Sequence, residues 1–239
     1  GVTNLVDFCR SDNARLIHVS TVSVSGMRAK DSAHTGVLNE SGLYIGQEID
    51  NQYVMSKFLS ERVVLQAVAE GMDGKVMRVG NLMGRQSDGE FQINFRSNAF
   101  INTLRSYQVL GMFPLSGLIA PAEVSPIDCV ARAVHVLSKT PSEVVVLHAY
   151  NNYRLNMANL VYAMKDYGFD LELVSDERFN EHFKEMMQDP AKSEYLGGLL
   201  HYGTDTEKVP VPDDNSYTTL LLYRNDVRWP LADEGYSLK

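Results

Sequence analysis

Tyr53 and Lys57 are the two residues of this sequence whose types and spacing point most directly to chemistry. A separation of four residues on an α-helix places a phenol and an ammonium group on one face, within reach of a common ligand. A neighbouring cation favours the phenolate, so we expect the pKa of Tyr53 to fall from a reference value of about 10 toward the range useful for proton transfer. The pair is a candidate proton donor, with a solvated tyrosine and lysine on a helix surface as the alternative.

Hydroxyl side chains end the short apolar run at residues 15–20. Ser20, Thr21 and Ser23 lie where a buried strand would give way to a loop. Ligands of open α/β folds bind at the carboxyl ends of strands, and a hydroxyl there can donate a hydrogen bond to a carbonyl oxygen as negative charge builds on it. An ordinary Ser/Thr-rich turn is the alternative.

A second predicted strand, residues 75–79, is followed by small and amide residues. Gly80 and Asn81 follow it directly, and their sizes suit the close approach of a planar ring. A plain turn between a strand and a helix would look the same. The two segments together predict polar groups at one edge of a sheet.

Hydrophobic periodicity predicts the elements that position these residues. Apolar residues recur at helical spacing over residues 51–70, with Asp50 or Asn51 as the cap. The β-branched run at residues 143–149 is typical of a strand buried on both faces. Because strands alternate with helices, we expect an α/β fold with a parallel sheet, followed beyond residue 151 by mostly helical segments.

Composition narrows the class of protein. The chain has 239 residues, 44% hydrophobic and 22% charged, and a net charge of -8 that disfavours a nucleic-acid partner. No apolar run approaches the roughly 20 residues that cross a bilayer. Cys9 and Cys129 cannot build a disulfide framework, so a cytoplasmic setting is expected. No metal-ligand spacing occurs, and His18 and His148 lie in strand patterns that favour core roles over ligation.

Several motifs together resemble a known family. They are Ser-Thr-Val-Ser at 20–23, Asn51-Gln-Tyr-x-x-Ser-Lys-Phe58 with Glu61, and Arg78-Val-Gly-Asn-Leu-Met-Gly-Arg85. In these residues the chain resembles an extended short-chain dehydrogenase/reductase. More closely, it is similar to the terminal thioester reductase domain of nonribosomal peptide synthetases, a relative of carboxylic acid and aminoadipate reductases. Segments 89–95, 113–114, 125–128 and 218–230 fit the same pattern, so the resemblance spans almost the whole chain.

The resemblance implies a catalytic set and a reaction. Thr21 would hydrogen-bond the substrate carbonyl, Tyr53 would donate the proton, and Lys57 would hold the nicotinamide ribose of NADPH and lower the pKa of Tyr53. A thioester on the phosphopantetheine arm of a carrier protein would be reduced to an aldehyde, with further reduction to an alcohol left open. The residues implied near the cofactor are Ser20, Tyr53, Lys57, Gly80, Asn81 and Leu82, and those implied near the substrate are Thr21, Ser23, Asn81 and Met83.

The same resemblance implies two parts. Residues 1–90 and 124–150 would form the C-terminal half of a Rossmann-like dinucleotide-binding domain. Residues 91–123 and 151–239 would form a smaller, mostly helical subdomain on the side of the substrate and the carrier.

One departure from the family concerns the pyrophosphate site. The family opens with a glycine-rich turn before a helix, but no two of the 17 glycines here are separated by a single residue. We therefore expect an N-terminally truncated domain that binds NADPH weakly and is inactive alone. We also expect the sheet edge near residues 15–20 to be covered by the missing half, a second copy or a partner.

Two other functions stay open. A nucleotide-sugar epimerase or dehydratase of the same extended type shares the tyrosine and lysine, although the Gly-Asn-Leu-Met-Gly-Arg run and the acidic, helix-rich tail argue against it. The other alternative is a non-catalytic fragment that docks a carrier protein, which the absent glycine-rich turn would explain.

Overall fold

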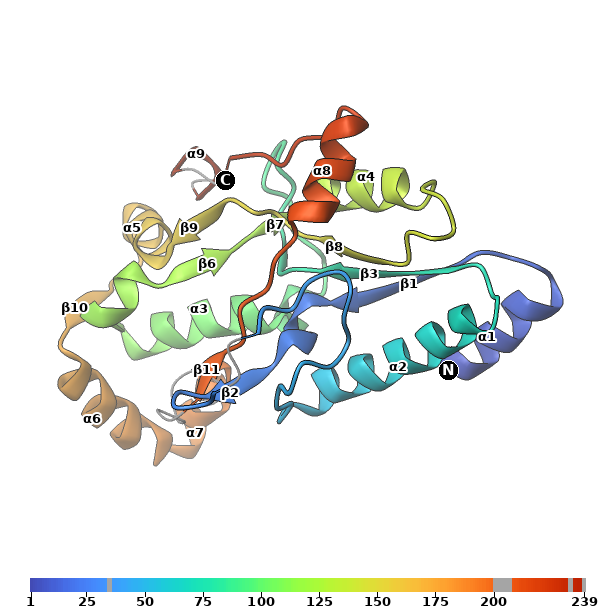
Figure 1. The fold of residues 1–239 in the computed structure, drawn as a ribbon. Helices are drawn as coiled ribbons and strands as arrows, with labels where there is room; N and C mark the ends of the chain where they lie inside the picture. The colour runs from blue at the N-terminus through green and yellow to red at the C-terminus, as the bar shows by residue number, and fades with distance from the viewer. Residues whose placement is uncertain (34–35, 200–207, 232–233, 238–239) are drawn as a thin grey trace. The chain divides into compact units, whose positions relative to one another are not determined.

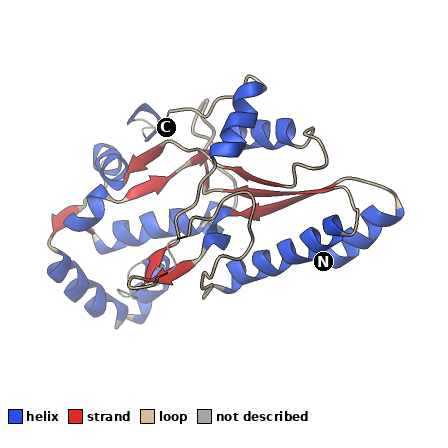
Figure 2. Ribbon diagram, in the orientation of Figure 1, coloured by secondary structure: helices blue, strands red, loops and turns tan. Residues whose placement is uncertain are grey.

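The computed structural model describes residues 1–33, 36–199, 208–231 and 234–237 of the chain. It has an α/β fold that divides into two compact units (Figures 1 and 2). Unit 1 comprises Gly1–Leu82, Ser125–Asn152 and Glu207–Pro230, and unit 2 comprises Met83–Val124, Tyr153–Thr206 and Leu231–Lys239. The predicted parts overlap these units but place residues 208–230 differently, and the assignment of the parts to cofactor and substrate stays a prediction.

A three-stranded parallel sheet forms the centre of unit 1. Its order is β1-β3-β8, and Thr21 lies beside Val79, which lies beside Ala149. The strands are β1 (Leu16–Thr21), β3 (Gly74–Val79) and β8 (Val146–Ala149). The predicted parallel α/β arrangement is therefore confirmed. β1 is an edge strand of this sheet and Val19 is 45% exposed, while the expected covering of that edge stays a prediction.

Helices cover both faces of this sheet (Figure 1). One face packs on α1 (Val2–Ser11) and α2 (Gln52–Ala69), the other on α4 (Ile127–Leu137) and α8 (Ser216–Arg224). All six residues of β3 are buried, as expected for a central strand with helices on both sides. Apolar residues of α2 recur at helical spacing on the side that faces the sheet. Val64 and Ala67 of this helix form one apolar cluster with Val6 of α1 and Val76 of β3.

The described residues of the connection between β1 and α2 contain regular structure. They include a 3-10 turn, Val22–Ser25, and strand β2 (Met27–Ala29), which pairs antiparallel with β11 (Lys208–Pro210). The partner strand is distant in sequence, so no local pattern reveals this pairing. The segment after β11 continues the contact, since Leu38 exchanges backbone hydrogen bonds with Pro212 and Asp214.

Unit 2 is built from helices and short strand pairs. Its apolar core includes Phe100, Phe113, Leu160 and Leu171. β5 (Met112–Pro114) and β10 (Glu172–Val174) pair parallel, whereas β6 (Pro121–Glu123) and β9 (Arg154–Asn156) pair antiparallel. The helices are α3 (Ala99–Leu110), α5 (Met157–Asp166), α6 (Asp176–Met187), α7 (Pro190–Ser193) and α9 (Glu234–Ser237). Two-residue strands β4 (Leu82–Met83) and β7 (Ser125–Pro126) lie at the borders of the units.

Candidate active site

Tyr53 and Lys57 lie on the first two turns of α2. The Asn51 side chain accepts hydrogen bonds from the backbone N–H groups of Tyr53 and Val54, at 2.8 and 3.2 Å, so Asn51 is the cap that starts the helix. The Lys57 Nζ lies 5.9 Å from the centroid of the Tyr53 ring. Tyr53 is 60% exposed. The two side chains thus share one face, with the phenol open to a ligand.

Lys57 also ties α2 to the sheet. Its Nζ donates a hydrogen bond of 3.1 Å to the carbonyl oxygen of Val19, two residues before Thr21. The ammonium group is therefore held between the tyrosine of the helix and the end of β1. This contact brings the helix and strand halves of the predicted catalytic set into one region of unit 1.

The Thr21 hydroxyl occupies the turn that follows β1. Its Oγ1 accepts a hydrogen bond from the Ser23 N–H at 3.2 Å and donates one to the Ser23 Oγ at 3.1 Å. Thr21 is buried and Ser23 is exposed. Ser23 therefore provides both a donor and an acceptor for the threonine hydroxyl.

The other predicted cofactor residues lie at the same edge of the sheet. Gly80 and Asn81 directly follow β3, whose last residue, Val79, pairs with Thr21. Both residues therefore lie at the carboxyl end of the sheet, next to the end of β1. The Asn81 carbonyl oxygen accepts a hydrogen bond of 3.0 Å from the Ser125 N–H. Ser20 is 2% exposed, and its Oγ has no hydrogen-bond partner among the described residues.

Leu82 and Met83 fall on either side of the boundary between the units. Leu82 packs against the apolar core of unit 1, next to α4 and α8. Met83 belongs to unit 2 and packs against its core. The structure thus gathers the predicted residues of unit 1 at one sheet edge, and the predicted role of Met83 stays a prediction.

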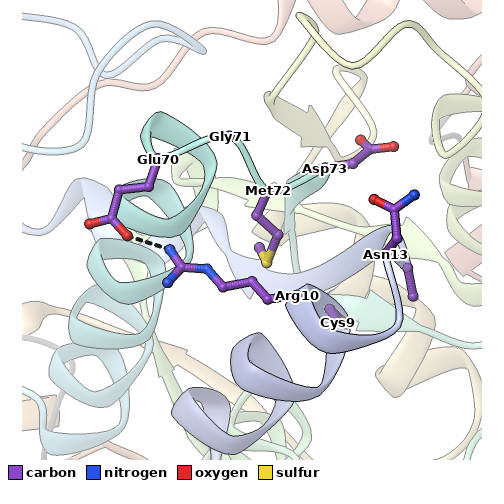
Figure 3. A pocket seen from close by; sticks show the side chains of 8 residues that line it. Cys9, Arg10, Asn13, Glu70, Gly71, Met72 and Asp73 are labelled. Carbon is purple, nitrogen blue, oxygen red and sulfur yellow. Dashed lines mark hydrogen bonds and ion pairs between the residues drawn. The ribbon is translucent and has the colours of Figure 1, made fainter.

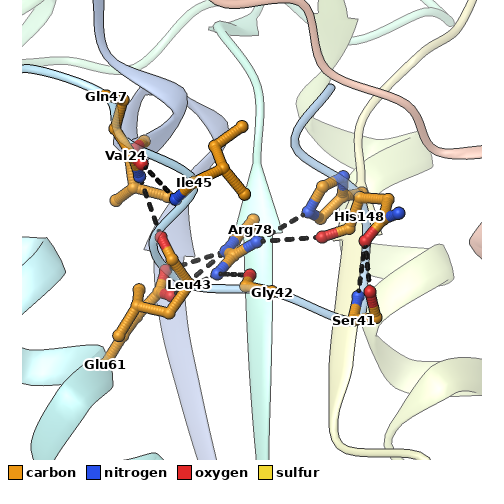
Figure 4. A network of polar contacts seen from close by, with 10 residues as sticks. Val24, Ser41, Gly42, Leu43, Ile45, Gln47, Glu61, Arg78 and His148 are labelled. Carbon is orange, nitrogen blue, oxygen red and sulfur yellow. Dashed lines mark hydrogen bonds and ion pairs between the residues drawn. The ribbon is translucent and has the colours of Figure 1, made fainter. Parts of the chain in front are cut away.

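Sequence reasoning missed a buried charge network beside this edge, shown in Figure 4. Arg78 of β3 and Glu61 of α2 are both fully buried and form an ion pair of 2.8 Å. The guanidinium group also reaches the carbonyl oxygens of Asn39 and Gly42 and the Nε2 of His148. An arginine inside an apolar strand pattern was the available signal, because a buried guanidinium requires a counterion.

His148 completes the network as a neutral acceptor. Burial, together with the Arg78 cation, lowers the pKa of His148 to about 4. Its Nδ1 lies 2.7 Å from the Asp214 carbonyl oxygen, a contact in which the ring donates. The Nε2 is then free to accept from Arg78 at 3.0 Å, which confirms the predicted core role of this histidine.

A pocket among the described residues lies elsewhere. It has a volume of about 330 Å³ and is shown in Figure 3. Its lining comes from residues 9–14 and 70–73, which precede β1 and β3, so it opens at the amino ends of the strands. An ion pair between Arg10 and Glu70 spans part of it. Because the predicted catalytic groups lie near the carboxyl ends, this pocket is not their binding site.

Within the described ranges there is no group of three or more His, Cys, Asp or Glu residues that could hold a metal ion. No helix in the described part of the chain is long and apolar enough to span a membrane.

A parallel sheet with a capped Tyr-x-x-x-Lys helix beside a Ser-Thr strand end is the arrangement that the resemblance to an extended short-chain dehydrogenase/reductase implies. The sequence profile of an NAD-binding family described as male sterility protein matches residues 1–134. The chain belongs to this family.

Solved structures and a curated relative extend the match. A thiolation-reductase di-domain from an archaeal non-ribosomal peptide synthetase is 32% identical, with a TM-score of 0.84 over 99% of this chain and 50% of that one. The reductase domain of the aureusimine biosynthetic cluster is 28% identical, with a TM-score of 0.85 over 100% and 62%. The L-2-aminoadipate reductase large subunit of Candida glabrata is 27% identical over 188 residues, which are 76% of this chain and 13% of the relative.

These matches confirm the resemblance to terminal reductase domains of nonribosomal peptide synthetases and to aminoadipate reductases. They also show a difference in length, because the chain spans 50% and 62% of the two solved relatives and 13% of the curated one.

Proposed function

We propose that this chain carries the catalytic residues of an NADPH-dependent reductase that releases a carrier-bound acyl or peptidyl thioester as an aldehyde. The observation that carries the proposal is the placement of Tyr53 and Lys57 on one helix face, with Lys57 bonded to the strand that ends in Thr21. The similarity to a thiolation-reductase di-domain and to an aminoadipate reductase supports it.

The residues at this edge fit the nicotinamide end of such a cofactor. The buried Ser20 Oγ lacks a partner among the described residues, and the Tyr53 phenol and Lys57 ammonium lie on the neighbouring helix face. Ser20, Tyr53 and Lys57 would hold the nicotinamide ribose, and Gly80, Asn81 and Leu82 would line the ring. The bound cofactor would supply a hydride to the substrate carbonyl carbon.

The chain's own residues would manage the proton. The Thr21 hydroxyl would turn from Ser23 to donate to the carbonyl oxygen, where negative charge develops. Tyr53 would transfer its proton to that oxygen, and the Lys57 cation would stabilise the phenolate that remains. The resulting thiohemiacetal would lose its C–S bond, re-form a C=O bond and release the aldehyde and the carrier thiol.

Substrate contacts follow from the same placement. Ser23 is exposed beside Thr21, and Asn81 is exposed at the end of the next strand, so both would contact the thioester and its pantetheine arm. Met83 would contact the acyl chain. The partner would be a phosphopantetheinylated carrier domain.

The test uses the full-length protein that contains this chain. Supplied with NADPH and an acyl-pantetheine thioester, it should consume the reduced nicotinamide and form an aldehyde. Tyr53→Phe should lower the rate by about 10²–10⁴-fold, as expected for loss of a general acid, whereas Tyr217→Phe on the exposed face of α8 should not change it. Conversion of a UDP-sugar without net cofactor consumption would favour an epimerase. Carrier binding with no reduction, equal in both variants, would favour a docking fragment.

A further inference from the structure

We infer that Arg78 and Glu61 are positioning residues for the proposed reduction. They would set the rotation of α2 and the course of the loop before it, so that Tyr53 and Lys57 meet the end of β1. The expected effect on kcat rests on the proposed function. The expected effect on the order of α2 and the loop before it can be tested independently of that function.

Every N–H group of the Arg78 guanidinium has a partner (Figure 4). Nε donates to both Glu61 carboxylate oxygens at 3.1 Å, and Nη2 donates to Glu61 Oε2 at 2.8 Å and to the Gly42 carbonyl oxygen at 2.9 Å. Nη1 donates to His148 Nε2 at 3.0 Å and to the Asn39 carbonyl oxygen at 3.4 Å. The planar guanidinium group directs its five N–H donors at four residues. It therefore fixes the positions of these residues, which a single point charge would not do.

Glu61, the partner of Arg78 on α2, lies on the same side of the helix as Tyr53 and Lys57. Tyr53, Lys57 and Glu61 are separated by four residues each, so they follow one another along one side of α2. Glu61 is bonded to Arg78, and Arg78 pairs in register with Ser20, the neighbour of Thr21. The ion pair therefore fixes the rotation of the helix against the strand position next to the one that carries the proposed catalytic hydroxyl.

Arg78 also contacts the loop that leads to the start of α2. Arg78 holds the carbonyl oxygens of Asn39 and Gly42. A few residues later, Gln47 donates from Nε2 to the carbonyl oxygens of Val24 and Leu43, at 3.0 and 2.8 Å, and thereby joins the loop to the turn after Thr21. The chain then reaches the cap, Asn51, and the helix.

Stability alone does not explain an ion pair in this place. Replacement of a buried ion pair by apolar residues of similar volume is often neutral or stabilising, whereas removal of one partner leaves an uncompensated charge. The specific effect of this pair is to hold the helix and the loop in position. Its removal should therefore lower kcat even in a variant that folds well.

The test is the double variant Glu61→Leu with Arg78→Met in the full-length protein, with Lys75→Met as the matched control. Lys75 is also fully buried on β3, and its Nζ donates to the carbonyl oxygens of Pro141 and Val144, but at the amino end of the strand. Circular dichroism and thermal unfolding first establish that both variants are folded. Two readouts then follow: hydrogen–deuterium exchange over residues 36–57, and the kcat and KM of thioester reduction.

We expect faster exchange over residues 39–47 and in the first turns of α2 in the double variant but not in Lys75→Met. We expect its kcat to fall by about 10²-fold, the scale of a misplacement of about 1 Å, with KM changed far less. Arg78→Lys, which keeps the charge but lacks the fork, should give an intermediate kcat.

Three results would overturn the inference or separate it from the function. Unchanged exchange in the double variant would show that the pair does not hold the loop, and unchanged kcat would show that it does not position the catalytic groups. A wild-type protein that reduces no thioester would contradict the proposed function. In that case the exchange comparison alone would decide whether Arg78 positions α2 and its loop.

Discussion

At both ends of the sheet in unit 1, cationic side chains donate hydrogen bonds to the carbonyl oxygens of a loop. At the amino end, the buried Lys75 and the partly buried Arg15 donate to backbone carbonyl oxygens of the turn between α4 and β8. At the carboxyl end, Arg78 donates to the carbonyl oxygens of Asn39 and Gly42. In both places a cation on or beside the sheet holds a loop that has no regular structure.

The difference lies in what else is present. The amino end has a pocket, but its ion pairs, Arg10 with Glu70 and Arg15 with Asp73, consist of charges already paired with each other. The carboxyl end has an exposed phenol in Tyr53, an ammonium group beside it and the hydroxyl of Thr21. The polar groups at the carboxyl end are therefore a better guide to chemistry in this molecule than the pocket at the amino end.

Removal of the Lys57 ammonium should have the largest effect. Lys57→Met should lower the rate of thioester reduction by about 10²–10⁴-fold, because the proposed proton donor loses its neighbouring cation and α2 loses its bond to Val19. Steady-state kinetics on the full-length protein measure this. Lys75→Met at the opposite end should keep most of the activity, and equal losses in the two variants would erase the difference between the ends.

Removal of one partner of the buried pair should cost the most stability. Arg78→Met leaves the fully buried Glu61 carboxylate unpaired and should lower the free energy of unfolding by about 3–5 kcal/mol. Lys75→Met loses two hydrogen bonds to carbonyl oxygens but leaves no unpaired charge of its own, so about 1–3 kcal/mol is expected. Urea titration compares them. A larger loss for Lys75→Met would show that the amino end anchors the sheet more strongly.

Acid should weaken the carboxyl end through His148. Its pKa is lowered to about 4 in the folded state, so the unfolded chain, with a value near 6.5, binds the proton more readily. The contribution of His148 is complete above about pH 6.5 and is lost as the pH falls toward 4, a change of about 3–4 kcal/mol at about 1.4 kcal/mol per pKa unit.

His148→Gln tests this pH dependence. It should flatten the fall in unfolding free energy between these pH values, because glutamine does not titrate but can still accept from Arg78. His135→Gln, at an exposed position on α4, should leave the slope as it is. A slope unchanged by His148→Gln would mean that other groups govern the acid response.

The helix cap should give the smallest effect. Asn51→Ala removes the acceptor for the Tyr53 and Val54 N–H groups and should cost about 1 kcal/mol. The loss should appear as a lower Tm, and Asn51→Asp should restore it. If Asn51→Ala and wild type melt together, the start of α2 is held by the loop contacts instead.

The extent of sequence prediction differs between these regions for physical reasons. The helix at residues 52–69, its cap Asn51 and the strands around residues 16–21 and 74–79 were predictable because local periodicity and capping chemistry determine them. The spacing of Tyr53 and Lys57 already implied a shared face. The family resemblance supplied roles that spacing alone could not.

What could not be predicted depends on residues far apart in sequence. The pairing of β2 with β11 joins segments about 180 residues apart (Met27 with Pro210). The contacts of Arg78 with Glu61, Gly42 and His148 each depend on the tertiary fold. An arginine in a buried strand signals that a counterion exists, but the sequence alone does not choose among the 30 acidic residues.

The most direct measurement is a single-turnover reaction of the full-length protein with NADPH and an acyl-pantetheine thioester, in which aldehyde is quantified by mass spectrometry. We expect one aldehyde per oxidised cofactor in the wild type, and almost none on the same timescale in Thr21→Ala or Tyr53→Phe. Aldehyde formed at the wild-type rate by the Tyr53→Phe variant would contradict the assignment of the proton donor and, with it, the proposed site.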